Sequence, residues 1–199
     1  MSEISRRDLL RNVALSAALG GLTAEAAQHV HEIAAADKQK TAGVYKPKAF
    51  TSNEWAALRR LCDLIFPADS RSKGALEAGA PEFIDLLASH NSEIAAIYTG
   101  GLAWLDHEML MRYGASFASA KPDQQTAMLD LIAYRKTAET QPELGPGIHF
   151  FEWARKMTAD AYYTSKVGVA DLGYMGNKGM TKFEVPAEAI EYALKRSGL

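Results

Sequence analysis

The chain is poor in cysteine, because Cys62 is the only one among its 199 residues. A lone cysteine cannot form a disulfide within the chain, so any disulfide would have to join two chains. The same scarcity excludes a Cys-x-x-Cys-His haem attachment site and a cysteine-held iron–sulfur cluster. Cys62 falls on the apolar stripe of a predicted helix, which favours a buried packing residue over a reactive thiol or a cross-link to a partner.

The chain also lacks an excess of charge of either sign. It has 22 Lys and Arg against 24 Asp and Glu, a formal net charge of −2, and no basic block that would attract nucleic acid. A weakly apolar run over residues 13–22 covers about half of the roughly 20 residues that a membrane-spanning helix needs. The hydrophobic content of 48% and the length predict one packed globular domain behind a leader.

No motif for a cofactor or a metal stands out. The nearest approach to a dinucleotide-binding loop, around Gly173, Gly176 and Gly179, has the wrong spacing and no preceding strand. The five histidines (His29, His31, His90, His107 and His149) form no i, i+4 pair of the kind that holds zinc on a helix. We therefore expect no cofactor, no metal and no catalytic residue in this chain.

Three aspartates are candidate acid–base residues: Asp63, Asp69 and Asp85. Asp63 falls on the polar side of its predicted helix, and Asp69 follows Pro67 in a turn, where capping is the commoner role. A structural role is therefore favoured over catalysis.

The first 26 residues have the three parts of an export leader. A basic start with Arg6 and Arg7, followed by Leu9, has the twin-arginine pattern; the weakly apolar run comes next, and Ala24-Glu25-Ala26 forms a small-x-small cleavage site. Cleavage is expected before Ala27. The alternative is an amphipathic N-terminal helix that happens to contain two arginines.

Hydrophobic periodicity predicts an all-α fold of about five to six helices with long Gly/Pro-rich loops. We expect a leader at 1–26, an arm or linker at 27–49 with an Ala-rich middle that could be helical, and a helical domain at 50–199. The first domain helix begins at a Thr51–Glu54 capping box and ends before Pro67. The other expected helices start at Pro81 and span 93–113, 122–139, 149–164 and 186–196.

Two segments are candidates for contact with a partner: the loop that begins at Pro67 (PADSRSKGALEAGAP) and residues 161–177. Residues 161–177 combine adjacent tyrosines, a Thr-Ser pair and Gly-Tyr steps, which give rigid aromatic area on a backbone that another surface can approach closely. The alternative is a loop packed on its own domain. The predicted interface residues are Pro67, Asp69, Tyr162, Tyr163, Thr164, Ser165, Gly168, Gly173, Tyr174, Gly176 and Asn177.

Three stretches carry a resemblance to a known family. They are FTSNEWAALRRLCDLIFPAD, GALEAGAPEFIDLL and YYTSKVGVADLGYMGN, in this order behind a twin-arginine leader. Over about residues 50–186 the chain resembles the gluconate 2-dehydrogenase subunit 3 family, the small subunits of membrane-associated sugar and sugar-acid dehydrogenases.

The resemblance implies a helical protein without a prosthetic group, bound to a large FAD-containing subunit of the glucose–methanol–choline oxidoreductase type. It further implies an iron–sulfur cluster in that subunit, a multihaem cytochrome c as electron acceptor, and a periplasmic location at the inner-membrane face. The expected function is to stabilise the large subunit and carry it through the twin-arginine (Tat) translocase. The alternatives are an exported binding module without such a partner and a periplasmic enzyme with an unrecognised site.

Overall fold

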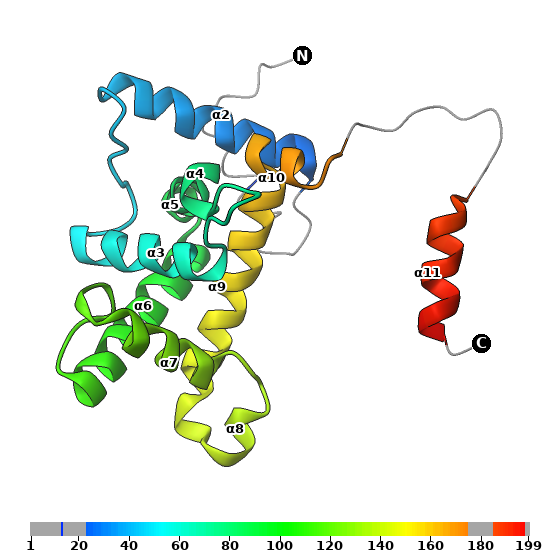
Figure 1. Cartoon of the computed structure of the whole chain (residues 1–199). Coiled ribbons are helices and arrows are strands. Elements are labelled where there is room, and N and C mark those ends of the chain that lie inside the picture. The colour runs from blue at the N-terminus through cyan, green and yellow to red at the C-terminus, as the bar shows by residue number, and fades with distance from the viewer. Residues whose placement is uncertain (1–12, 14–22, 175–184, 198–199) are drawn as a thin grey trace.

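The computed structural model describes residue 13, residues 23–174 and residues 185–197. Every regular element in these ranges is a helix, which confirms the all-α expectation (Figure 1). In chain order they are α2 (Ala24–Lys40), α3 (Ser52–Ile65), α4 (Ala75–Ala78), α5 (Ala80–His90), α6 (Ser92–Tyr113), η1 (Phe117–Ser119), α7 (Pro122–Ile132), α8 (Thr137–Thr140), η2 (Pro142–Leu144), α9 (Gly145–Tyr163), α10 (Lys166–Asp171) and α11 (Ala187–Ser197). None of the helices described in these ranges combines the length and the apolar composition needed to cross a membrane.

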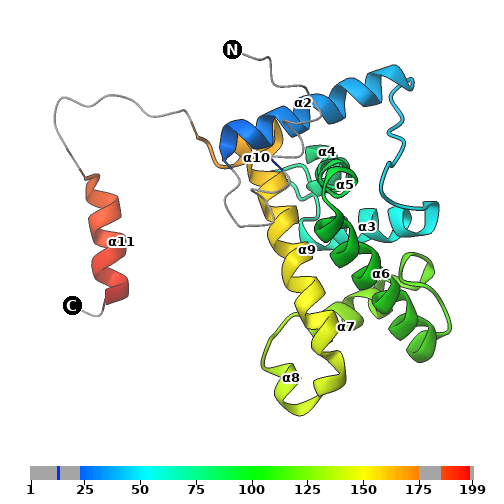
Figure 2. The same ribbon diagram turned by 180° about the vertical axis from the view of Figure 1, so that it is seen from behind.

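Helix α5 forms the centre of the bundle. All its residues from Ala80 to Ala88 are buried, and it packs against α2, α3, α6 and α9 (Figures 1 and 2). Gly79 turns the chain sharply into this helix with a φ of 77°, and Pro81 occupies its first turn, where a missing N–H costs nothing. The sequence predicted that Phe83, Ile84 and Leu87 would be buried, whereas the structure buries every side of the helix.

Helix α3 begins as the sequence predicted. The Thr51 hydroxyl accepts a hydrogen bond from the Glu54 N–H at 3.4 Å, and the Glu54 carboxylate accepts one from the Thr51 N–H at 2.8 Å. This reciprocal capping box satisfies two N–H groups at the start of the helix. Cys62, on the inner face of α3, is fully buried, which confirms its expected packing role.

Two helix boundaries differ from the sequence prediction. Helix α7 ends at Ile132 instead of near residue 139, because Ile132 is its last buried apolar residue and Tyr134 points into solvent. Helix α9 begins at Gly145 instead of His149, since Pro146 fits the first turn of a helix and does not break it. The short helices α4, α8 and α10 had no counterpart in the prediction.

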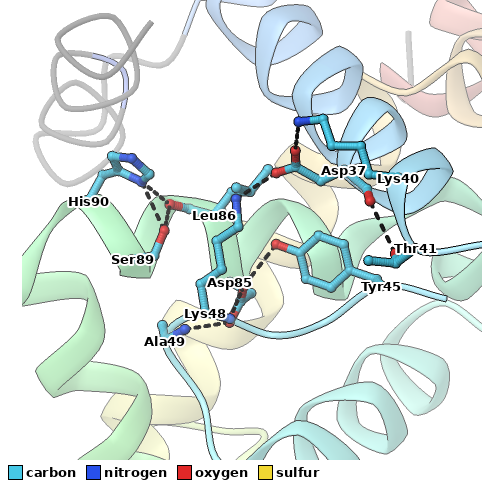
Figure 3. A network of polar contacts seen from close by, with 10 residues as sticks. All are labelled: Asp37, Lys40, Thr41, Tyr45, Lys48, Ala49, Asp85, Leu86, Ser89 and His90. Atoms are coloured by element: carbon cyan, nitrogen blue, oxygen red, sulfur yellow. Dashed lines mark hydrogen bonds and ion pairs between the residues drawn. The ribbon is translucent and has the colours of Figure 1, made fainter.

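The segment predicted as an arm packs against the bundle. Its Ala-rich part forms α2, whose buried face includes Val30 and Ile33 and lies against α5. The residues that follow are held by Asp85 of α5, which accepts hydrogen bonds from the Tyr45 hydroxyl at 2.9 Å, the Lys48 N–H at 2.9 Å and the Ala49 N–H at 2.9 Å (Figure 3). Asp85 thus has the structural role that the sequence favoured.

Helices α6 and α9 approach each other closely through two glycines. A Cβ at Gly101 of α6 would overlap the Phe150 ring, and a Cβ at Gly147 of α9 would overlap the Trp104 ring. Helix α6 runs without a break from Ser92 to Tyr113, and Gly101 lets α9 pack closely against it.

Alanine substitutions at the adjacent Gly100 and Gly101 of α6 should have opposite effects on stability. We expect Gly101→Ala to lower the free energy of unfolding by about 1–3 kcal/mol, because Phe150 must move to make room. Gly100→Ala, at an exposed position with no atom within 4 Å of the added Cβ, should raise it by up to about 1 kcal/mol through helix propensity. Urea unfolding followed by circular dichroism measures both, and a Gly101→Ala variant as stable as Gly100→Ala would contradict this packing.

Two buried tyrosine hydroxyls provide a second matched pair. In the described part of the chain the Tyr98 hydroxyl has no hydrogen-bond partner, whereas the Tyr45 hydroxyl donates to Asp85. We expect Tyr98→Phe to raise the free energy of unfolding by about 1 kcal/mol, since it removes an unsatisfied buried group, and Tyr45→Phe to lower it by about 1.5–3 kcal/mol. The same urea titration tests both, and destabilisation by Tyr98→Phe would show that its hydroxyl is satisfied.

Candidate partner interface

The two segments predicted to contact a partner lie against each other. They are the loop at residues 67–73, after α3, and the turn at residues 162–174, which includes α10. Tyr162 joins them: its hydroxyl donates to the Lys73 carbonyl at 3.0 Å and lies 2.5 Å from the Ser72 hydroxyl. The Tyr162 ring stacks on Phe66 with centroids 4.9 Å apart. We call the exposed surface of these two segments the loop–turn surface.

Asp69 shapes the loop. Its carboxylate accepts hydrogen bonds from the Arg71 N–H at 2.8 Å and the Ser72 N–H at 2.7 Å. These two backbone donors lower the pKa of Asp69, because they favour the charged carboxylate. The turn role predicted for Asp69 is therefore confirmed, and the side chain is exposed beside Pro67.

Three of the predicted interface residues build the turn itself. Ser165 caps α10: its hydroxyl donates to the Tyr162 carbonyl at 2.6 Å and accepts from the Gly168 N–H at 3.0 Å. A Cβ at Gly168 would overlap the Tyr162 carbonyl, so the turn requires glycine there. Since Tyr162, Ser165 and Gly168 are all buried, they position the loop–turn surface and offer little of it to a partner.

The remaining predicted residues are exposed, half-buried or outside the described ranges. Tyr163 is 40% exposed, and Gly173 and Tyr174, at the other end of the turn, are exposed as well. Leu172, at 60% exposure, adds apolar area that the sequence prediction missed, because it falls in an expected loop where no periodicity marks an outward face. Thr164 is half-buried, while Gly176 and Asn177 lie outside the described residues.

The predicted export-signal residues are placed only in part. Arg6, Arg7 and Leu9 lie outside the described residues, whereas Ala24 and Ala26 occupy the first turn of α2. Thr23 caps that turn by accepting a hydrogen bond from the Ala26 N–H at 3.2 Å. The predicted cleavage point before Ala27 thus falls within a helix.

Possible metal ligands and the single cysteine were the other candidates for chemistry in this chain. Over residues 13, 23–174 and 185–197, no three His, Cys, Asp or Glu side chains are grouped so as to hold a metal ion. Burial raises the pKa of the Cys62 thiol to about 12, so the thiol stays protonated at neutral pH and is a poor nucleophile. What the surface can offer is contact area, namely aromatic and aliphatic side chains on a rigid turn.

Comparison with known proteins agrees with this picture. The profile of the family described as gluconate 2-dehydrogenase subunit 3 matches residues 52–180, about two thirds of the chain. The chain belongs to the gluconate 2-dehydrogenase subunit 3 family. Searches of curated proteins and of solved structures returned no match.

The family match begins at α3 and includes both segments of the loop–turn surface. As a member of a dehydrogenase-subunit family, the chain is expected in a complex with a larger dehydrogenase subunit. Helices α2 and α11 lie outside the matched range. All residues of α11 are exposed, and Figures 1 and 2 both draw it apart from the other helices.

The hydroxyl of Tyr162 should stabilise the loop–turn surface. We expect Tyr162→Phe to lower the free energy of unfolding by about 1 kcal/mol, because it removes the hydrogen bond to the Lys73 carbonyl while keeping the stacked ring. Tyr163→Phe, at the exposed neighbouring position, should change it by less than about 0.5 kcal/mol. Limited proteolysis should also cut the loop at residues 67–73 faster in Tyr162→Phe, and equal cutting in the two variants would contradict the role of this contact.

Proposed function

We propose that this chain is the noncatalytic small subunit of an exported, FAD-dependent sugar, polyol or glycoside dehydrogenase. In this proposal it binds the flavin-containing large subunit, helps that subunit to fold and stay stable, and carries it out of the cytoplasm. Substrate oxidation and the flavin belong to the large subunit, and a multihaem cytochrome c takes up the electrons. The observation that carries the proposal is the match to a dehydrogenase-subunit family over residues 52–180.

The loop–turn surface supports a binding role. This surface presents apolar and aromatic area from Pro67 of the loop and from Tyr163 and Leu172 of the turn. Hydrogen bonds of Tyr162 and Ser165 hold the turn in place. A rigid surface loses little conformational entropy on binding, and tyrosine is enriched among the residues that contribute most to interfaces.

Export of the complex would explain the twin-arginine pattern at Arg6 and Arg7. That pathway carries folded proteins, and a flavoprotein has to fold around its cofactor in the cytoplasm before export. A large subunit without a leader of its own would then depend on the signal of its partner. The complex would reach the periplasm and lie at the inner membrane through its cytochrome subunit.

Co-expression with the gene of the large dehydrogenase subunit tests this proposal. We expect the large subunit to be exported and active with the wild-type chain, and to remain in the cytoplasm with the Arg6→Lys, Arg7→Lys double variant. Arg11→Lys, in the same basic start, is the matched control and should leave export unchanged. Sugar-dependent dye reduction and flavin fluorescence are measured in periplasmic and cytoplasmic fractions.

The same strains separate the competing functions. If the large subunit folds, is exported and works equally well without this chain, the proposal fails. If the purified chain alone turns over a substrate without flavin, it is an independent enzyme. If no flavoprotein copurifies with the chain, the binding-module alternative holds instead.

A further inference from the structure

A cavity of about 520 Å³ lies where α2, the α4–α5 corner and the α9–α10 turn meet. Figures 1 and 2 both show α2 and α10 next to each other at this end of the bundle. Its size is that of an ordinary small-ligand site. Its wall is mostly apolar. The alanine and valine side chains in it are those of Ala34, Ala35, Ala78, Val167 and Val169.

Glu82 of α5 lies in the wall of this cavity and is only 1% exposed. Its Oε1 is 2.9 Å from the Lys38 ammonium and 3.8 Å from the Arg59 guanidinium, yet neither contact has the geometry of a hydrogen bond. Its Oε2 has no hydrogen-bond partner in the described part of the chain. A buried carboxylate oxygen without a donor is costly, and such a group in a native protein calls for an explanation.

The charge of the cavity is negative. Glu32, Glu77 and Glu82 line it, against the two ammonium groups of Lys38 and Lys166. Burial lowers the pKa of His31, which also lines the cavity, so its ring stays neutral at neutral pH and adds no positive charge. The surroundings therefore favour a ligand that brings a positive charge and several hydrogen-bond donors.

We propose that this cavity receives an arginine side chain of the partner subunit, whose guanidinium donates hydrogen bonds to Glu82. The inference rests on the proposed function, because it needs a partner chain. The alanine and valine walls suit the methylene stem, and the planar guanidinium suits a buried carboxylate better than an ammonium does because it is less strongly hydrated. Lys38, whose side chain is 40% exposed, can turn into solvent as the guanidinium enters.

The position of the cavity fits a docking role. Thr164 and Ser165, from the predicted interface, line it, which makes it continuous with the loop–turn surface. A hydrogen bond of 3.2 Å between His31 Nε2 and Thr164 Oγ1 joins α2 to the end of α9. Arginine is enriched among the residues that contribute most to protein interfaces, and such residues fill well-packed pockets.

The first experiment measures binding of N-acetyl-arginine amide to the purified chain by NMR, with the neutral N-acetyl-citrulline amide as the matched probe. We expect the arginine probe to shift the His31 ring signals and to bind at least about tenfold more tightly than the citrulline probe. Glu82→Gln and Ala35→Leu should each weaken binding of the arginine probe by about tenfold or more. Ala36→Leu places the same side chain on α2 outside the cavity and should bind like the wild type.

The second experiment measures the affinity of the same variants for the large subunit. Glu82→Gln and Ala35→Leu should each raise the dissociation constant by about tenfold or more, whereas Ala36→Leu should not change it. Ala35 lines the cavity at an exposed position, so Ala35→Leu narrows the cavity while Glu82 is retained, and it remains informative if Glu82→Gln unfolds. Thermal unfolding of each variant accompanies the measurement.

The outcomes distinguish this inference from the proposed function. If both cavity variants bind the large subunit as tightly as the wild type, the cavity is not a docking site, although the complex itself exists. If Ala35→Leu has no effect and Glu82→Gln alone weakens the complex, Glu82 acts through the fold and the inference is overturned. If the wild-type chain forms no complex with the large subunit, the proposed function fails, and this inference fails with it.

Discussion

Two buried carboxylates on the central helix attach the N-terminal segment of this protein to the bundle. Helix α5 is buried on every side, yet it carries two carboxylates, Glu82 and Asp85. Asp85 obtains its donors from the segment after α2, and Glu82 obtains ion pairs from Lys38 of α2 and Arg59 of α3. Because a buried carboxylate without partners is strongly unfavourable, these contacts attach the N-terminal segment to the bundle as an integral part of it.

The attachment of α2 to the bundle matters for the proposed leader, because the expected cleavage point lies within this helix. Cleavage before Ala27 would remove Thr23, whose carbonyl accepts from the Ala27 N–H at 3.0 Å, and would leave a charged amino group at the start of α2. A positive charge there opposes the helix dipole, and the N-cap is lost as well. The mature helix would then depend on its buried face and on the Lys38–Glu82 ion pair. The α2 residues that line the cavity all follow the cleavage point and would be retained.

Features that depend on neighbouring residues could be predicted from the sequence. The Thr51–Glu54 capping box, the end of α3 before Pro67 and the end of α6 before Gly114 all appear in the structure. The resemblance to the small-subunit family likewise rested on residues close together in the chain, and the family match confirms it. The start of α9 was wrong in the prediction because Pro146 can either break a helix or begin one, and only its packing decides.

The sequence by itself determined the longer helices, most of their ends and the family, because caps, proline positions and apolar periodicity are local properties of the chain. Only the tertiary structure decided which interface residues are buried and where Glu82 and Asp85 find partners. Tyr162 meets Lys73 across 89 residues, and Tyr45 meets Asp85 across 40. The cavity beside α2 likewise combines residues from three separate parts of the chain. Such contacts depend on how helices pack, which no local pattern specifies.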